Sequence, residues 1–321
     1  MSTPVILTIG KATQDVFLTS SKSFIAQKHK GVLYEQLPLG KKLDLDDVVF
    51  ATGGNVTNAA TTFARQGLHS VYMWVLGTDV ASQVILSSLD QEGIDTSHVV
   101  QDSLYRASYS TILLAATGER TILNYHGTTL SAGGSQLDLR AIESADWVYL
   151  SALGDMELLE KIVTIAHEHG VKVMLNPAGS ELQETNKLKA LLEDVEILVV
   201  NKEEAQQLVA GETLEELVRH ATNYCPIVIV SDGPQGAVIT DSKTIITSGM
   251  YEDVPVVDRT GGGDAFGSGF LSMWSRGKSL KESVIFASAN STSVVTQIGA
   301  KAGILPQGVT LHSMPIKEGS F

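Results

Sequence analysis

The stretch V-V-D-R-T-G-G-G-D-A-F-G-S-G-F, from Val256 to Phe270, places three consecutive glycines before an aspartate and then resumes an apolar pattern. Phe266, Phe270 and Trp274 follow one another at intervals of four residues, which predicts one apolar face of a helix that begins close to Asp264. The glycines would then lie at a helix N-terminus, where free backbone N–H groups and the positive end of the helix dipole converge without Cβ atoms in the way. A tight turn capped by Asp264 is the simpler interpretation, but a cap needs one aspartate and not three glycines. We therefore expect an anion-binding pocket at this turn.

Two common phosphate-binding motifs do not account for this stretch. Gly277-Lys278-Ser279 supplies the end of a Walker A loop, but Ser272 occupies the place of its first glycine. Phe266 stands where a G-x-G-x-x-G fingerprint that begins at Gly261 needs its last glycine. An aspartate beside anion-binding amides has another use, because the amides stabilise charge on a transferring phosphoryl group while the carboxylate accepts the proton of an attacking hydroxyl. The stretch thus predicts a phosphoryl-transfer centre in which the helix N-terminus keeps Asp264 ionised at neutral pH.

The composition is that of an ordinary globular protein. Hydrophobic residues make up 43% of the 321 residues, which is ample for a sizeable core. The net charge of −13, without a cluster of Lys and Arg, argues against nucleic acid as a partner, because binding along a phosphate backbone needs a basic surface. The single cysteine, Cys225, excludes an intrachain disulfide and predicts a small buried side chain. The chain starts without a signal-peptide pattern and no apolar run approaches membrane-spanning length, so we expect a cytoplasmic protein without a membrane partner.

Short β-branched runs alternate with amphipathic segments from residue 71 onward. The runs are Val71–Leu76, Trp147–Leu150, Val171–Leu175, Ile197–Val200 and Ile227–Val230. The amphipathic segments between and after them include Glu157–His169, Leu214–Asn223 and Leu280–Gln297. This order predicts an α/β fold of three α/β/α layers, in which a doubly wound, mostly parallel sheet carries helices on both faces.

Two regions, residues 14–50 and 105–126, interrupt this alternation. They contain the strand-like runs Val32–Leu37, Ser108–Ala115 and Thr121–Tyr125 without helical patterns between them, and Gly118 supplies a turn. We expect these regions to form a small β-sheet lid that projects from the main body. Because no interdomain linker stands out, residues 1–321 are predicted to form a single domain with the lid inserted in it.

Five short segments occur in a fixed order along the chain. They are Asp15, Gly53-Gly54-Asn55-Val56-Thr57-Asn58, Asn201-Lys202-Glu203-Glu204, Ser231-Asp232-Gly233-Pro234-Gln235-Gly236 and Asp258-Arg259-Thr260-Gly261-Gly262-Gly263-Asp264. In that order they resemble the early substrate-binding aspartate, the G-G-x-x-x-N sugar-binding segment, the N-x-x-E motif, the T-x-G-x-x-G nucleotide loop and the D-T-x-G-A-G-D signature of the ribokinase-like, PfkB-type carbohydrate kinases. The resemblance covers nearly the whole chain and implies a ribokinase-like fold.

The resemblance also implies a role for each matching residue. Asp264 would be the general base, and the amides of Gly261, Gly262 and Gly263 would form the anion hole. Asp15, Gly54, Asn55 and Asn58 would bind substrate hydroxyls. Asn201, Ser231, Asp232, Gly233, Pro234, Gln235, Gly236, Gly263 and Ser288 would approach the nucleotide. Asn201 and Glu204 would organise Mg²⁺ through water and phosphate, and Asp258, Thr260, Val294, Gln297, Gly299 and Gly303 fall at the positions of a monovalent-cation site for an ion such as K⁺.

Three residues depart from the family pattern. Arg259 stands where the family usually has a small residue, and it would either approach the phosphates or point into solvent. Gly262 replaces the common alanine and preserves access to the main chain. Asp232 is unusual in the nucleotide loop, which leaves the phosphate donor open.

Several single residues also have simpler interpretations. Asp15 is typical of a turn after a strand, and Asn58 would equally serve as the N-cap of the helix that leads to Arg65. His167-Glu168-His169 lacks the histidine spacing of H-E-x-x-H and is expected on a solvated helix face. Tyr125 and His126, at the end of a lid strand, would either cover a substrate or lie on an exposed strand.

The function implied by the resemblance is transfer of the γ-phosphoryl group of ATP, as its Mg²⁺ complex, to a primary hydroxyl of a small sugar, polyol or related molecule. A nucleoside kinase of the same fold is the nearer alternative, because a ribose 5′-hydroxyl can occupy the same place. A non-catalytic sugar-binding protein is the more distant one. The lid segments contain only two arginines, Arg106 and Arg120, which favours a neutral sugar or nucleoside over a sugar acid. In the family the lid commonly pairs with its twin, so a homodimer is expected.

Overall fold

The computed structural model describes residues 3–115, 120–249 and 254–321. Its main sheet has the strand order β17-β16-β15-β14-β13-β12-β11-β1-β6. These strands are β1 (Val5–Ile9), β6 (His69–Met73), β11 (Trp147–Ser151), β12 (Lys172–Asn176), β13 (Ile197–Asn201), β14 (Ile227–Ser231), β15 (Ala237–Thr240), β16 (Thr244–Ser248) and β17 (Ile316–Ser320). Neighbours from β6 to β14 pair in parallel, and β15, β16 and β17 continue the sheet antiparallel. The predicted mostly parallel sheet is confirmed.

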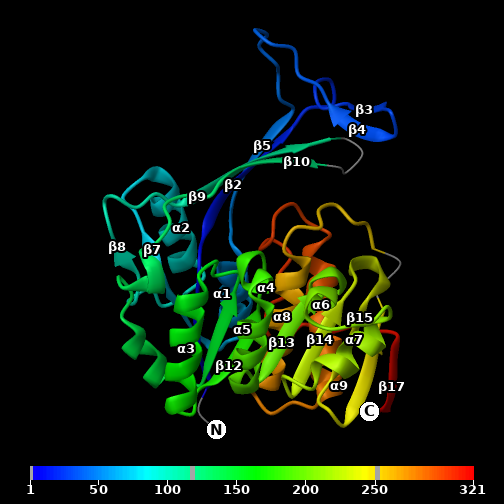
Figure 1. Ribbon diagram of the computed structural model, residues 1–321. Helices are drawn as coiled ribbons and strands as arrows, with labels where there is room; N and C mark the ends of the chain where they lie inside the picture. Colours follow the sequence, from blue (N-terminus) through cyan, green and yellow to red (C-terminus); the bar gives the residue numbers. More distant parts are fainter. Residues whose placement is uncertain (1–2, 116–119, 250–253) are drawn as a thin grey trace.

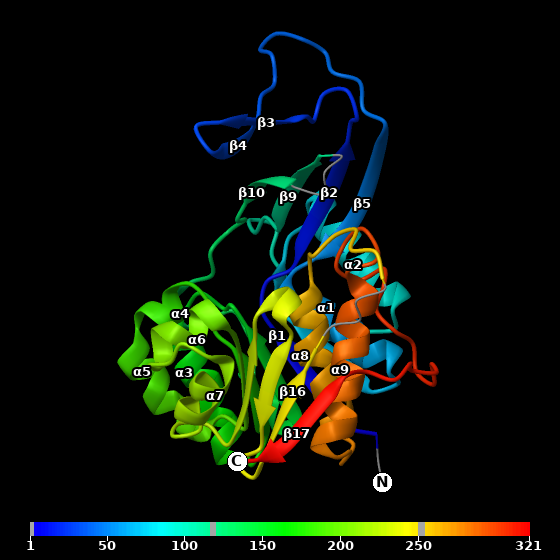
Figure 2. The same ribbon diagram turned by 90° about the vertical axis from the view of Figure 1, so that its right-hand side faces the viewer.

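Helices cover both faces of this sheet and make the molecule three layers thick (Figures 1 and 2). One face carries α1 (Asn55–Arg65), α2 (Val80–Gln91), α8 (Gly262–Trp274) and α9 (Leu280–Val294). The other carries α3 (Met156–Glu168), α4 (Ser180–Gln183), α5 (Thr185–Leu191), α6 (Lys202–Leu208) and α7 (Leu214–Ala221). Short 3₁₀ turns lie at Ala132–Gly134, Leu139–Ser144, Leu192–Asp194 and Gly233–Gln235. Because both faces are covered, the central strands are nearly continuous apolar runs, as the sequence suggested.

The expected strand Val71–Leu76 is wrong in one respect, because it breaks at Trp74. β6 ends at Met73, and Val75–Leu76 forms a separate strand, β7, that pairs with β8 (Val100–Gln101) outside the main sheet. The carbonyl of Trp74 accepts a hydrogen bond from the amide of Val100, which turns the backbone away from β1. An uninterrupted apolar run cannot reveal such a change of partner.

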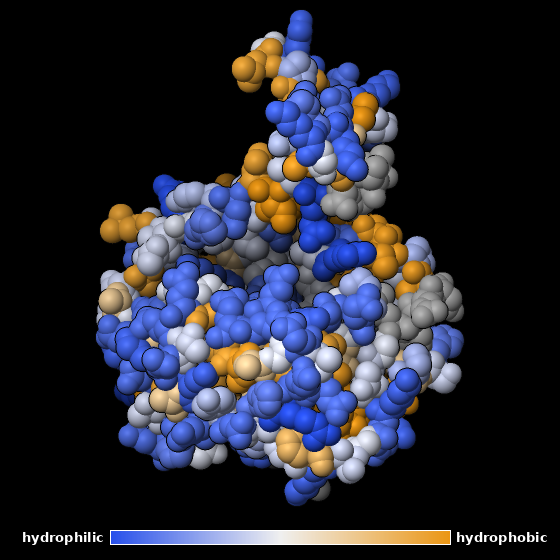
Figure 3. Space-filling model, turned by 45° about the vertical axis from the view of Figure 1, so that its right-hand side comes forward, coloured by the Kyte–Doolittle hydropathy of each residue, from blue (hydrophilic) through white to orange (hydrophobic). Residues whose placement is uncertain are grey.

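The lid regions form a second sheet in the order β10-β9-β2-β5. Its strands are β2 (Thr13–Thr19), β5 (Asp47–Gly53), β9 (Ser108–Leu114) and β10 (Arg120–Tyr125), and a separate hairpin joins β3 (Ala26–His29) to β4 (Val32–Glu35). This part of the chain rises from the three-layer body (Figure 1) and stands over a hollowed face of it (Figure 3). The turn expected at Gly118 lies outside the described residues. Among the described ranges, no helix has both the length and the apolar character that crossing a membrane requires.

Helix α8 begins at the glycine run, as its apolar spacing predicts. Its N-cap is Gly261 and not Asp264, and Gly261 has the left-handed angles φ 78° and ψ 0°. A Cβ atom on Gly261 would lie 2.4 Å from the Cβ of Ala300, whereas one on Gly263 would have no neighbour within 4 Å. The first glycine is therefore required by the backbone, and the third leaves open space beside the helix end.

Replacing Gly261 and Gly263 by alanine, one at a time, should distinguish the glycine that the backbone conformation requires from the glycine that leaves open space. We expect Gly261→Ala to lower the free energy of unfolding by about 1–3 kcal/mol, because it forces a side chain into a left-handed conformation against Ala300. Gly263→Ala should leave stability unchanged or raise it by up to about 1 kcal/mol, because alanine favours a helix. Urea denaturation of both variants measures the difference. Equal losses in the two would contradict the assignment of strain to Gly261.

Candidate active site

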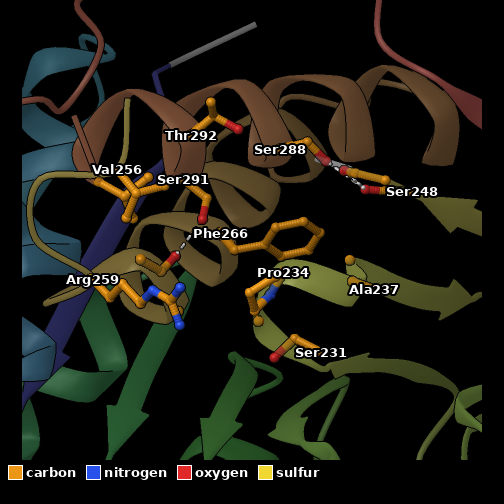
Figure 4. A pocket seen from close by; sticks show the side chains of 16 residues that line it. Ser231, Pro234, Ala237, Ser248, Val256, Arg259, Phe266, Ser288, Ser291 and Thr292 are labelled. Carbon is orange, nitrogen blue, oxygen red and sulfur yellow. Dashed lines mark hydrogen bonds between the residues drawn. The ribbon is translucent and has the colours of Figure 1, made fainter. Parts of the chain in front are cut away.

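A cavity of about 260 Å³ opens between the start of α8, the side of α9 and the ends of β14 and β16. It is lined by Ser231, Gly233, Pro234, Gly236, Ala237, Ser248, Gly249, Val256, Arg259, Gly262, Gly263, Phe266, Ser288, Ser291, Thr292 and Val295. The side chains of Phe266 and Pro234 face the same space below α9, with Arg259 at one end and Ser288 toward the other (Figure 4). Most of its wall is apolar, which suits a flat aromatic ligand.

The glycine run supplies unpaired main-chain donors to one end of this cavity. The amide of Gly262 makes a long hydrogen bond of 3.4 Å to the carbonyl of Arg259, and Gly262 and Gly263 both line the cavity. Within the described part of the chain, no carbonyl accepts from the amide of Gly263, which is exposed. These amides and the helix dipole together make a site for negative charge.

Asp264 lies one residue beyond these amides and contacts a helix from the other end of the chain. The Nδ2 of Asn58, on α1, donates a hydrogen bond of 2.8 Å to Oδ2 of Asp264, across 206 positions of sequence. Burial raises the pKa of Asp264 to about 6, and the hydrogen bond from Asn58 acts in the opposite direction. The expectation that the helix N-terminus keeps Asp264 ionised therefore omits the effect of burial, which favours the protonated form. A pKa of about 6 still leaves the ionised form favoured at pH 7.

Asn58 has a second polar atom that nothing satisfies. Asn58 is only 4% exposed, and its Oδ1 is buried without a hydrogen-bond partner among the described residues. Buried acceptors are nearly always paired in folded proteins. An acceptor left open beside Asp264 fits a ligand hydroxyl that donates to it. Asn58 is not the N-cap of α1, since that position belongs to Gly54, so the simpler interpretation of Asn58 is wrong.

The remaining predicted substrate residues lie around the base of the lid. Gly54 has φ 99°, and a Cβ on it would lie 2.5 Å from the carbonyl oxygen of Lys11. Asn55 donates 2.9 Å to the hydroxyl of Ser151 at the end of β11. Asp15 is buried within β2 and not at a turn, and burial raises its pKa although Ser110 hydrogen-bonds to it. In the described residues only Asn58 of this group touches Asp264 directly.

Sequence reasoning missed Lys301. Its Nζ donates 2.9 Å to the hydroxyl of Thr52 in β5. Burial lowers the pKa of Lys301 to about 8, while the negative charges of Asp15 and Glu92 act to raise it. Lys301 lies outside the two lid segments in which the sequence was considered for basic residues. The one sign of its role in the sequence is that a lysine stands among small residues in G-A-K-A-G.

The predicted monovalent-cation residues gather around Asp258, which is 3% exposed. Its Oδ1 accepts from the amide of Thr260 at 3.0 Å and its hydroxyl at 2.7 Å, and its Oδ2 accepts from the amide of Gly299 at 3.0 Å. The guanidinium of Arg120, at the start of β10, lies 3.9 Å from Oδ1. Both carboxylate oxygens therefore accept hydrogen bonds within the fold, and a monovalent-cation site beside Asp258 stays a prediction.

The other predicted members of that set lie close by without adding a free charge. Val294 ends α9 and is fully buried, and Gln297 follows in the next turn. A Cβ atom on Gly303 would lie 2.3 Å from the carbonyl oxygen of Ser293. These residues would offer a monovalent cation main-chain carbonyls and one amide side chain.

The predicted magnesium residues form a helix cap. The amide of Glu204 donates 2.9 Å to Oδ1 of Asn201, and Oε2 of Glu204 accepts 2.9 Å from the amide of Asn201, which makes a capping box at the start of α6. Burial raises the pKa of Glu204. The described residues contain no group of three or more His, Cys, Asp or Glu arranged for a metal. Neither residue lines the cavity, but Asn201 pairs with the lining residue Ser231 across β13 and β14. Two oxygen-bearing side chains fit Mg²⁺ that keeps most of its waters, and do not fit a protein cage.

Some residues of the predicted nucleotide loop line the cavity, and others do not. Ser231, Gly233, Pro234 and Gly236 line the cavity together with Ser288, whose hydroxyl lies 2.7 Å from that of Ser248. Asp232 and Gln235 are not among the lining residues. The carboxylate of Asp232 lies 3.9 Å from Nζ of Lys202 instead.

Other residues singled out in the sequence lie away from the cavity. His167 pairs at 2.8 Å with Asp194 on an exposed helix face, as expected. Tyr125 is 55% exposed on β10, which agrees with the simpler interpretation that it lies on an exposed strand. Cys225 is buried as predicted, and burial raises the pKa of its thiol to about 12.

The chain resembles known proteins over most of its length. Residues 30–307 match the family described as pfkB family carbohydrate kinase. A ribokinase from Haemophilus influenzae is 27% identical over 85% of this chain and 90% of its own length, and a 2-dehydro-3-deoxygluconokinase from the same organism is 29% identical over 71% of this chain and 81% of its own. The structure of Arabidopsis thaliana ribokinase complexed with ribose and ATP superposes with a TM-score of 0.76 at 22% identity, covering 95% of this chain and 96% of that one. That likeness shows a ribokinase-like fold, and the family match over most of the chain shows that it belongs to the pfkB family of carbohydrate kinases.

The pH dependence of turnover should report Asp264. We expect kcat/KM to fall below about pH 6, because only the ionised carboxylate accepts a proton and burial raises its pKa to about 6. In Asn58→Leu the loss of a hydrogen bond that favours the ionised form should move this acid limb to higher pH. Initial rates from about pH 5 to 8 measure it, with Gln207→Leu on the exposed side of α6 as the control. An acid limb that stays in place in Asn58→Leu would show that another group controls it.

Proposed function

We propose that the chain is an ATP-dependent kinase that phosphorylates a primary hydroxyl of a small sugar or related molecule. The observation that carries the proposal is the position of Asp264, one residue beyond the free amides of the glycine run and hydrogen-bonded to Asn58. Asp264 takes the hydroxyl proton as general base, and the amides of Gly261, Gly262 and Gly263 hold the negative charge of the transferring group.

The acceptor lies on the Asn58 side of Asp264. The open Oδ1 of Asn58 accepts one substrate hydroxyl, and a second hydroxyl donates to Asp264 before it attacks. Asp15, Gly54 and Asn55 complete this side at the base of the lid. The supporting feature is that each of these groups is fixed by its own neighbours, since precise placement of reactants supplies much of the rate in phosphoryl transfer.

The donor lies in the cavity on the other side of the glycine run. Phe266, Pro234 and Val256 offer an apolar slot for a nucleobase, and the phosphates extend toward Gly263. Mg²⁺, when bound, neutralises charge on the β- and γ-phosphates. Asn201 and Glu204 hold its waters while keeping the start of α6 capped.

The amino group of Lys301, which interacts with Asp15, extends the range of acceptor molecules to be considered. The preference for a neutral acceptor rested on the scarcity of arginine in the lid, but Lys301 brings a partly buried amino group to the lid base. Sugar acids therefore belong beside neutral sugars and nucleosides as candidate acceptors.

Residues 14–50 and 105–126 act as a lid on one domain that spans residues 1–321, and the lid limits hydrolysis of ATP by water.

The exposed surface of the lid is the reason why we propose a homodimer. Leu39 is 98% exposed and Phe50 69% exposed, and apolar side chains lie among polar ones on the projecting part (Figure 3). Other exposed apolar lid residues are Ile25, Val32, Leu33, Tyr34, Leu37, Ile122 and Leu123. A cluster of this kind is typical of a protein–protein contact.

Sedimentation tests the dimer. The chain should sediment with twice the monomer mass at micromolar concentration, and Phe50→Glu should shift it toward the monomer, because a charge would be buried at the contact. Val80→Glu, an exposed apolar position on α2 outside the lid, is the matched control. A wild-type chain that sediments as a monomer would contradict the proposal.

The catalytic assignment is tested with Asp264→Asn. We expect kcat to fall about 10²- to 10⁴-fold with little change in nucleotide affinity, the range expected for loss of a positioned base. The variant should keep or raise its Tm at pH 7, because the native pKa of about 6 lies above the ordinary 3.8, so ionised Asp264 disfavours folding at neutral pH. The assay follows ADP formation with neutral sugars, sugar acids and nucleosides. Near-normal turnover of the variant would contradict the role of Asp264 as general base.

The same assay separates the alternatives. Turnover confined to nucleosides would identify a nucleoside kinase. Saturable sugar binding without ADP formation by the wild-type chain would identify a non-catalytic binding protein. Turnover confined to nucleosides would change only the proposed acceptor, whereas sugar binding without ADP formation would contradict the proposed kinase activity.

A further inference from the structure

The cavity contains one charged side chain. Of the residues that line it, Arg259 alone carries a charge, and the others are small, apolar or hydroxyl-bearing. It lies at the end of the cavity formed by Gly262 and Gly263, and its guanidinium extends toward the interior (Figure 4). In a chain with a net charge of −13, a lone positive charge in a pocket suited to an anion needs an explanation.

The backbone around Arg259 is held from both sides. The carboxylate of Asp258 accepts from Thr260, and the amide of Asp258 donates 3.2 Å to the carbonyl of Val295 on the last turn of α9. The carbonyl of Arg259 accepts the bond from Gly262. The turn therefore fixes where the side chain of Arg259 begins, directly beside the anion-binding amides.

No interaction within the described ranges occupies this guanidinium. Arg120, the other arginine near this turn, lies against Asp258. No acidic side chain in residues 3–115, 120–249 and 254–321 forms an ion pair with Arg259. Arg259 is exposed, so it is not needed to fill the core. As far as the described residues go, its five N–H donors are available to a ligand in the cavity.

We propose that Arg259 binds the β- and γ-phosphates of the donor nucleotide and stabilises the charge that develops as the γ-phosphoryl group leaves. The inference rests on the proposed function and adds a catalytic residue on the donor side, opposite Asp264. A planar guanidinium can contact two phosphate oxygens at once, which the single-point charge of lysine cannot reproduce. The bond between the β-γ bridging oxygen and the γ-phosphorus breaks, the acceptor oxygen forms the new bond to that phosphorus, and the acceptor proton passes to Asp264. Arg259 contributes charge and position and exchanges no proton.

The test compares nucleotides that differ only in their phosphates. Affinities for adenosine, AMP, ADP and a non-hydrolysable ATP analogue are measured by calorimetry in the wild-type chain, Arg259→Met and Arg259→Lys, in the presence of Mg²⁺. Arg140→Met serves as the control, because Arg140 is an exposed arginine paired with Asp138 away from the cavity. Tm without nucleotide establishes that each variant is folded.

The expected result depends on phosphate number. In Arg259→Met the Kd of the ATP analogue should rise about 10- to 100-fold, the usual loss for a hydrogen bond to a charged group, while adenosine and AMP change less than about threefold. Arg259→Lys should recover part of the affinity, kcat should fall in both variants, and Arg140→Met should behave as wild type.

Two results would overturn the inference while leaving the proposed function intact. One is equal affinity of wild type and Arg259→Met for the ATP analogue, which would make Arg259 a solvated side chain. The other is an equal loss for adenosine and the ATP analogue, which would indicate a change in cavity shape. A wild-type chain that binds none of the four nucleotides would remove the proposed function as well.

Discussion

The contact between Asn58 and Asp264 is the constraint on which the site depends. It joins the start of α1 to the start of α8 and fixes the carboxylate between the two sides of the cleft. The two helices approach closely because small residues face each other; the hydroxyl of Ser268 donates 2.9 Å to that of Thr62 about one turn further along each helix. The amide group of Asn58 thus performs one task and leaves a second open, since Nδ2 orients the carboxylate and Oδ1 is buried without a partner in the described residues. In the proposed function, any change that separates α1 from α8 would move the acceptor relative to the phosphates.

The electrostatics of the site follow from burial. Asp15 and Asp264 both have a raised pKa because they lie away from water, and Lys301 has a lowered one for the same reason. Opposite charges offset each other where they meet, as Arg120 does at Asp258. The main-chain amides add positive charge without a further basic side chain, which allows a strongly acidic protein to hold a polyanion. Arg259 is the exception, because its charge faces the cavity.

Much of the fold and the anchor of the site could be predicted from sequence, for local reasons. Parallel strands covered on both faces are continuous apolar runs, and α8 carries its apolar residues at helical spacing directly after the glycines. The break at Trp74 could not be predicted, because it depends on a pairing with Val100 that local pattern does not encode. Lys301 was missed for a similar reason, since its partner Thr52 lies 249 positions away. The lack of space for a side chain at Gly261 likewise depends on Ala300, which follows α9 in the chain.

The distance of 206 positions between Asn58 and Asp264 has a consequence for synthesis of the chain. Translation begins at the N-terminus, so the acceptor side and most of the parallel strands emerge before α8 exists. In the proposed function, a chain that ends before α8 lacks both the acid and the amides that would activate a phosphate. Phosphoryl transfer would then become possible only after α8, one of the last helices, has been synthesised.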